Sequence, residues 1–404
     1  MRTMHVLLWL VVSLSACDRS VDTVEPPSVE TAAAAETIKA KTQASLSVIR
    51  AGHDYHSYAN PREARIKHLD LDLTADFDLA IMKPGQTLYD VAHGCLDGLR
   101  DVARDFRPDL TLVQGDTATV FFASLVAFFE QTAVGHVEAG LRSHDKWAPF
   151  PEEVLRRLTG VITDVHFAPT VRAKANLLAE GVPGESIHVT GNTVVDALLR
   201  VARSESEIES PDAVRAVSHD GRLILLTAHR RESFGQPIRE VFHAVRDLVD
   251  AHQHVQVLYP VHPNPNVLNP AREILGDHPR ICLTEPIGYL DLVRVLQRAD
   301  LVLTDSGGIQ EEAPTFGTPV LVLREVTERP EGVDAGVAQL VGTDREKIVA
   351  AANSLLDMVG SPGAVAVHNP YGDGRAGERI ADIIHARFTA RGRYTQDWMP
   401  VSNG

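Results

Sequence analysis

Short apolar runs alternate with longer amphipathic stretches along most of the chain, and each apolar run ends in polar or glycine residues. Runs of this length predict buried strands, and the stretches between them predict helices. The predicted strands are 109–113, 134–137, 165–167 and 187–189, then 223–226, 255–259, 281–283, 301–304 and 320–323; the clearest helices are 120–129, 238–251, 289–298, 347–358 and 379–388. This alternation predicts α/β architecture with a parallel sheet covered on both faces, built twice in series.

The N-terminal stretch does not follow this pattern. Arg2 precedes an apolar run over 6–14 that leads to Cys17, an arrangement typical of a bacterial lipoprotein signal. A buried strand over 5–13 is the alternative, and a third is that this stretch is not a functional coding sequence. Residues 21–44 are rich in Thr, Ala and Glu and predict a weak helix or a disordered segment.

Two other stretches are also poorly patterned. Residues 204–220 are polar and acidic and contain Pro211, which favours a linker or a surface excursion near a domain boundary. No periodicity is visible after Arg391. A chain of 404 residues is long for one hydrophobic core, so two domains are expected.

Composition narrows the function classes. Hydrophobic residues make up 44% and charged residues 23%, as in a globular protein, and the net charge of −15 gives no reason to expect nucleic-acid binding. Cys17, Cys95 and Cys282 are too few and too scattered for a disulfide framework, which fits a reducing compartment. No pattern of Cys or His spacing indicates a metal site, and no run outside the N-terminus is long enough to span a bilayer.

The clearest site in the second half follows the predicted strand 301–304. Ser306, Gly307 and Gly308 form a turn before a helix, which is how backbone N–H groups and a helix dipole are directed at a phosphate. Glu312, one turn further, can accept hydrogen bonds from ribose hydroxyls. Arg324 and Arg329 follow the next strand and can face the same site. An ordinary strand-to-helix turn and surface arginines are the alternatives.

Two further loops of this half carry cationic or imidazole side chains. His229 and Arg230 follow the strand 223–226 and can hold a diphosphate; a solvated basic loop is the alternative. His262 lies in a stiff, proline-rich loop after the strand 255–259, where it either lines a cleft or holds the loop.

The first half contributes carboxylates. Asp116, Glu138 and Glu152 each follow a strand or begin the next helix, and strand carboxyl ends share one edge of a doubly wound sheet. Such a set can supply a general acid and a general base. Asp116 can instead cap a helix, and Glu152 can complement a helix start, with Arg156 one turn away as an ion-pair partner.

Many ordered strings resemble the non-hydrolysing UDP-N-acetylglucosamine 2-epimerases. They comprise Gln114-Gly115-Asp116-Thr117, the run 135–142, Pro151-Glu152-Glu153, Thr190-Gly191-Asn192-Thr193, the runs 229–233, 259–266 and 303–319, Thr327 to Glu331, and the run 368–374. The resemblance extends from about residue 72 to residue 385.

The resemblance implies a glycosyltransferase-B-like fold, in which two Rossmann-like domains are followed by a C-terminal helix that crosses back to the first. We therefore expect an atypical N-terminal segment (1–75), a first domain carrying acid/base residues (76–195), a second domain binding UDP (196–366), the crossing helix (367–390) and a tail (391–404). A cytoplasmic homodimer without stable membrane association and without a metal or redox cofactor is expected.

The implied reaction interconverts UDP-N-acetylglucosamine and UDP-N-acetylmannosamine through an enzyme-bound 2-acetamidoglucal. By position, Asp116, Glu138 and Glu152 match the family's acid/base candidates, and His229 matches its diphosphate-stabilising histidine. The nucleotide-binding positions match Ser306, Gly307, Gly308, Glu312 and Arg329. We also assign Arg156, Arg230 and His262 to substrate binding.

The N-terminus departs from this family, which begins with a strand and a Gly-Thr-Arg-Pro-Glu-Ala turn followed by a lysine. No such string occurs in residues 1–75, so we expect a first domain without its leading strand and weak turnover. Ile287 and Leu292 stand where the family usually places Gln and Phe around the uracil. The alternatives are an impaired nucleotide-sugar-binding homologue, a hydrolysing epimerase and a glycosyltransferase of the same fold.

Overall fold

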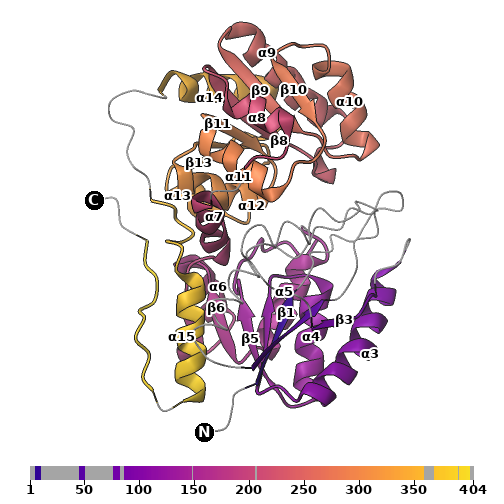
Figure 1. Ribbon diagram of the computed structural model, residues 1–404, viewed down its shortest axis with the longest axis vertical. Coiled ribbons are helices and arrows are strands. Elements are labelled where there is room, and N and C mark those ends of the chain that lie inside the picture. Colours follow the sequence, from indigo (N-terminus) through magenta and orange to yellow (C-terminus); the bar gives the residue numbers. More distant parts are fainter. Residues whose placement is uncertain are drawn as a thin grey trace. The chain divides into compact units, whose positions relative to one another are not determined.

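The computed structural model describes residues 5–10, 45–50, 76–81, 86–147, 149–204, 207–358, 368–389 and 391–400. Its contacts divide the chain into two compact units, one made of 1–197 and 371–399 and the other of 198–370 and 400–404. Each unit is built on a parallel sheet (Figure 1). The α/β class predicted from the sequence is therefore confirmed.

The first unit contains a seven-stranded sheet with the order β3-β2-β1-β4-β5-β6-β7. These strands are β1 (His5–Leu10), β2 (Ser45–Arg50), β3 (Phe77–Asp78), β4 (Leu110–Gln114), β5 (Ala133–Val137), β6 (Val165–Ala168) and β7 (Ile187–Val189). Every pairing is parallel. The order reverses between β1 and β4, which is the topological switch point where doubly wound sheets bind ligands.

Helices cover both faces of this sheet. They are α3 (Leu88–Phe106), α4 (Ala118–Phe129), α5 (Glu152–Ile162), α6 (Val171–Ala179) and α7 (Thr193–Arg203), joined by α15 (Ala376–Phe388) from the far end of the chain. On one face α3 and α4 bury Cys95, Leu99 and Val120 with Val113 of β4. On the other face Ile380 and Ile384 of α15 pack against Leu112 and Phe167. The expected return of the C-terminal helix to the first domain is confirmed.

The N-terminal strand corrects one expectation. Residues His5–Leu10 form β1, which pairs in parallel with β2 on one side and with β4 on the other. The first unit therefore has its leading strand at the centre of the sheet, and the predicted loss of that strand was wrong. A second strand, Ser45–Arg50, lies in sequence that showed no period. Cys17, the predicted segment 21–44 and the polar stretch 52–65 lie outside the described residues.

The second unit contains a six-stranded parallel sheet with the order β10-β9-β8-β11-β12-β13. Its strands are β8 (Arg222–Thr227), β9 (Val255–Pro260), β10 (Ile281–Thr284), β11 (Leu301–Thr304), β12 (Val320–Val322) and β13 (Ala338–Leu340). The order reverses between β8 and β11, so the residues that follow these two strands lie next to each other at the switch point.

Two apolar layers enclose this second sheet. One face packs against α9 (Gln236–Ala251), α10 (Pro265–Leu275) and α14 (Arg345–Met358). The other packs against α8 (Pro211–Val217), α11 (Tyr289–Arg298) and α12 (Gly307–Glu312), while α13 (Pro330–Asp334) precedes β13. The stretch predicted as a linker thus contains α8, whose N-cap Ser210 accepts a hydrogen bond from Ala213 N. Within the described ranges, no helix is both long and apolar enough to cross a membrane.

The tail after Arg391, in which the sequence shows no periodicity, makes specific contacts with the first unit. Asp382 of α15 accepts hydrogen bonds from the backbone N–H groups of Tyr394 and Thr395, and Trp398 donates one to the Val189 carbonyl of β7 at 2.8 Å. Trp398 is 6% exposed. Residues 391–399 therefore lie along the edge of the first sheet and form part of its unit (Figure 1).

Candidate active site

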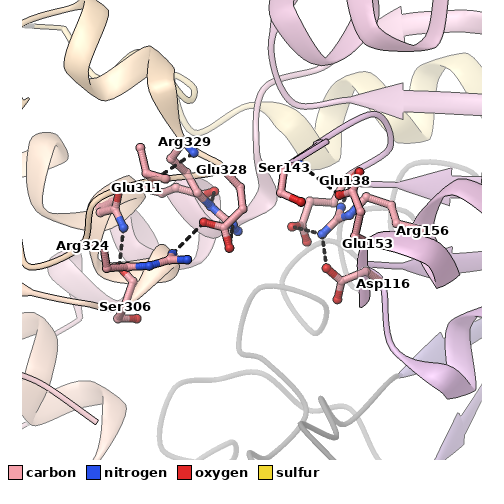
Figure 2. Close-up of polar contacts among 12 residues, drawn as sticks. Asp116, Glu138, Ser143, Glu153, Arg156, Ser306, Glu311, Arg324, Glu328 and Arg329 are labelled. Atoms are coloured by element: carbon pink, nitrogen blue, oxygen red, sulfur yellow. Dashed lines mark hydrogen bonds and ion pairs between the residues drawn. The ribbon is translucent and has the colours of Figure 1, made fainter. Parts of the chain in front are cut away.

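Asp116 and Glu138 of the first unit are joined by one buried arginine. Arg156 on α5 forms an ion pair with the Asp116 carboxylate, and its Nη2 lies 3.4 Å from Glu138 Oε1 (Figure 2). Its Nη1 also donates to the Glu138 carbonyl at 2.6 Å. The Arg156 side chain is only 5% exposed, whereas those of Asp116 and Glu138 are 25% and 15% exposed. The guanidinium thus orients two carboxylates that keep access to solvent.

The backbone explains how these two acids come together. Asp116 follows β4 after Gly115, whose φ of +87° turns the chain, and Glu138 follows the neighbouring strand β5 with φ +66°. His136 Nε2 donates to the Gly115 carbonyl at 2.7 Å, and burial lowers the pKa of His136 well below its usual range. The N-cap of α4 is Thr117, so the alternative role of Asp116 as a helix cap was wrong.

The third predicted acid, Glu152, is partly exposed and begins α5. Its neighbour Glu153, which the sequence did not single out, is 4% exposed and accepts hydrogen bonds from the backbone N–H groups of Ser143 and His144, at 2.9 and 3.2 Å. Glu153 therefore fixes the loop between β5 and α5. The alternation of apolar and charged residues in α5 gives no indication of which of the two adjacent acids faces inward.

In the second unit, Arg329 lies directly over the glycine turn. A Cβ added at Gly307 would lie 3.0 Å from the Arg329 guanidinium carbon, which shows how closely this side chain approaches the backbone. Glu311 Oε1 pairs with Arg329 Nε at 2.8 Å, and Ser306 forms the N-cap of α12. Glu312 is buried. The predicted nucleotide-binding residues of this turn therefore form one cluster with Arg329.

A chain of alternating charges continues from this cluster. Arg324 pairs through Nε with Glu232 and through Nη1 with Glu328, both at 2.7 Å, and Glu328 Oε1 lies 3.8 Å from Arg329 Nη1 (Figure 2). Although burial opposes its ionisation, the charges of Arg329 and Arg324 lower the pKa of Glu328 to about 2. Arg324 is 8% exposed, so the alternative of a surface arginine was wrong.

The histidines of the second unit lie together. The rings of His229 and His262 stack with centroids 5.7 Å apart and an interplanar angle of 16°. Asp305, at the end of β11, accepts hydrogen bonds from the backbone N–H groups of His229 and Arg230. The sequence did not predict this link, because the partners of Asp305 are 76 and 75 residues away along the chain. Within the described residues, no cluster of His, Cys, Asp and Glu could hold a metal ion.

Comparison with known proteins shows which family the chain resembles. A family model described as UDP-N-acetylglucosamine 2-epimerase matches residues 36–385, beginning earlier than the resemblance expected from residue 72. The Bacillus subtilis UDP-N-acetylglucosamine 2-epimerase is 49% identical over 310 residues, 76% of this chain and 80% of the relative. The Escherichia coli enzyme of that name is 46% identical over 321 residues, 77% and 85% of the two chains. The solved Neisseria meningitidis UDP-GlcNAc 2-epimerase, bound to UDP-GlcNAc, has a TM-score of 0.79 and 35% identity, covering 95% of this chain and 99% of that one.

Proposed function

The chain belongs to the UDP-N-acetylglucosamine 2-epimerase family, and on this basis we propose that it interconverts UDP-N-acetylglucosamine and UDP-N-acetylmannosamine. The observation that supports this most directly is the pair of carboxylates, Asp116 and Glu138, held by the buried guanidinium of Arg156. Inverting C2 of a sugar requires a base that removes the C2 proton and an acid that returns it to the other face.

The proposed reaction is elimination followed by re-addition. One carboxylate of the set Asp116, Glu138 and Glu152 takes the C2 proton, and the C1–O bond breaks with its electron pair leaving on UDP. The resulting 2-acetamidoglucal is protonated at C2 from the opposite face, and UDP oxygen adds again to C1. His229, Arg230 and His262 stabilise the diphosphate as charge develops on it, and Arg156 orients two of the acids.

Turnover is tested by incubating the chain with UDP-N-acetylglucosamine in deuterated water and following C2 by NMR. We expect deuterium at C2 of both epimers and UDP-N-acetylmannosamine as the product. Free N-acetylmannosamine and UDP as main products would identify a hydrolysing enzyme instead, and binding without exchange would identify a nucleotide-sugar-binding homologue. Transfer of the sugar to an acceptor would identify a glycosyltransferase.

We propose that UDP binds to the second unit at Ser306, Gly307 and Gly308, with Glu312 and Arg329. Gly307→Val places a branched side chain where Cβ alone would lie 3.0 Å from the Arg329 guanidinium carbon. We expect UDP affinity measured by calorimetry to fall by about tenfold, or about 1.4 kcal/mol. Gly392→Val is the matched control, because Gly392 lies in the first unit and a Cβ there would meet no atom within 4 Å. Unchanged affinity in a folded Gly307→Val protein would refute this placement.

We propose further that the chain forms a homodimer through α5. Val154, Leu158 and Val161 are 36%, 43% and 84% exposed and lie on one face of this helix at helical spacing. Phe128 and Phe129, 60% and 64% exposed, end the helix α4 that packs beside α5 (Figure 1). Exposed apolar residues gathered on one face of a helix mark interaction surfaces.

The dimer is tested by measuring molar mass in light scattering coupled to size exclusion. Leu158→Glu places a charge in the centre of the apolar face and should shift the mass from two chains to one. Val171→Glu is the matched control, because Val171 is similarly exposed, at 42%, but lies on a different helix, α6. A wild-type mass of one chain over the whole micromolar range would rule out the homodimer.

We also propose that the reaction takes place in the cytoplasm, in keeping with a nucleotide-sugar substrate.

A further inference from the structure

Asp305 connects the two strands that flank the switch point of the second unit. It follows β11 directly, its side chain is 1% exposed, and Oδ2 accepts hydrogen bonds from His229 N at 2.7 Å and Arg230 N at 2.8 Å. The turn after β8 is therefore held by a carboxylate from the next strand of the sheet. Because both N–H groups converge on Oδ2, the other carboxylate oxygen remains available for a different partner.

That partner is the imidazole of His229. Asp305 Oδ1 lies 3.5 Å from His229 Nδ1 and, although fully buried, has no hydrogen-bond partner among the described residues. A buried carboxylate oxygen almost always has a donor, and Nδ1–H is the donor within reach. Catalytic hydrogen bonds are often long before substrate binds and shorten in the complex. The opposite ring edge belongs to Nε2, and the His229 side chain is 37% exposed.

His262 stacks on the His229 ring, but its Nδ1 has a different kind of partner. Asn264 N donates to His262 Nδ1 at 3.1 Å, so this nitrogen carries no proton and Nε2 carries the only one. Burial and the neighbouring His229 lower the pKa of His262 to about 4, although Asp305 opposes the shift. Two stacked imidazolium rings would repel each other. The Asp305 carboxylate lies next to a nitrogen of the His229 ring, whereas Nδ1 of His262 already accepts a hydrogen bond from Asn264.

We propose that Asp305 is a positioning residue for His229. It holds the turn through Oδ2 and directs Nδ1–H toward Oδ1, so that Nε2–H donates to the diphosphate and the ring stays cationic as UDP departs. His262 remains a neutral donor beside it. This inference rests on the proposed function, because it assigns the charge of His229 to the leaving group of that reaction. No proton is transferred in this step; the imidazolium stabilises developing negative charge.

The test substitutes Asp305→Asn. The asparagine carbonyl can still accept from His229 N and Arg230 N, but its NH₂ group would face Nδ1 and require that nitrogen to accept. We expect kcat for epimerisation to fall on the order of 100-fold, as for the loss of one donor to developing negative charge, while KM changes by less than about threefold. In a His229→Gln background, the same Asp305→Asn substitution should change kcat by less than about threefold, because the residue through which it acts is gone.

A purely structural role for Asp305 predicts an equal loss in both backgrounds and would overturn the proposal. ¹⁵N NMR of histidine-labelled protein gives a readout that does not depend on turnover. The Nδ1 resonance of His229 is assigned as the one that disappears in His229→Gln. We expect it to show a protonated nitrogen in the wild-type protein and an unprotonated one in Asp305→Asn. An unprotonated His229 Nδ1 in the wild-type protein would also overturn the proposal. A wild-type protein without C2 exchange but with this Nδ1 signal would contradict the proposed function and leave the link between Asp305 and His229 supported.

Discussion

Replacing Arg156 with methionine should abolish most turnover and destabilise the first unit. The methionine keeps the apolar stem but removes the guanidinium that contacts Asp116, the Glu138 carboxylate and the Glu138 carbonyl. Loss of one partner from a buried ionic cluster typically costs about 3–5 kcal/mol, because the remaining charges are left uncompensated. Since both acids would also lose their orientation, we expect kcat to fall on the order of 1,000-fold.

The adjacent arginine provides a matched control. Arg157 lies on the same helix, is 56% exposed and pairs with Glu180 at 3.4 Å, so Arg157→Met should cost less than about 1 kcal/mol and leave kcat within a few-fold of wild type. Arg156→Lys keeps the charge but cannot contact three oxygens in a fixed fork, and its kcat should lie nearer to that of Arg156→Met than to wild type. Chemical denaturation and C2 exchange measure the two effects. Equal behaviour of the Arg156→Met and Arg157→Met proteins would contradict this role of Arg156.

The sequence predicted the strands well because buried parallel strands are continuous apolar runs. The runs 187–189 and 301–304 coincide with β7 and β11, and most other strands differ by one or two residues at their ends. The strand Ser45–Arg50 was missed because alternating serine and apolar residues there are too few to stand out from the surrounding polar sequence. The strand Ala338–Leu340 was missed for a different reason, since it has only three residues and two of them are exposed.

The sequence predicted individual residues of the candidate site but not the ion pairs and hydrogen bonds between them. Asp116, Glu138 and His229 were selected because they follow strands, and strand ends share one edge of a sheet. The ion pairs of Arg156 span 40 and 18 residues of sequence, and no local pattern reports them. The sequence offered an ion pair between Glu152 and Arg156 because they lie one helical turn apart. In the structure, Arg156 also pairs with Asp116 and Glu138 at the ends of two neighbouring strands.

The contacts of the C-terminal tail were also missed, because they join residues far apart in the sequence. They predict a large contribution of the tail to the stability of the first unit. Trp398 is 6% exposed, and its neighbour Asp397 accepts a hydrogen bond from Val189 N across a separation of 208 residues. Asp382 is 3% exposed, and one of its oxygens accepts from Tyr394 N at 3.0 Å and from Thr395 N and Oγ1 at 2.7 Å. These contacts join the tail to α15 and to the edge strand β7, so an apparently unpatterned segment becomes part of the fold.

Trp398→Ala should therefore reduce the free energy of unfolding by about 3–5 kcal/mol, the usual cost of removing a buried indole. Asp382→Ala should cost about 2–3 kcal/mol, because it removes a carboxylate, 3% exposed, that accepts three hydrogen bonds from Tyr394 and Thr395. Met399→Ala is the matched control: Met399 is the next residue along the chain but is 66% exposed, and its substitution should have an effect within about 0.5 kcal/mol. Urea denaturation followed by circular dichroism measures all three. If Trp398→Ala unfolded at the same urea concentration as Met399→Ala, the tail would contribute nothing to the stability of the first unit, and its contacts would not hold α15 in place.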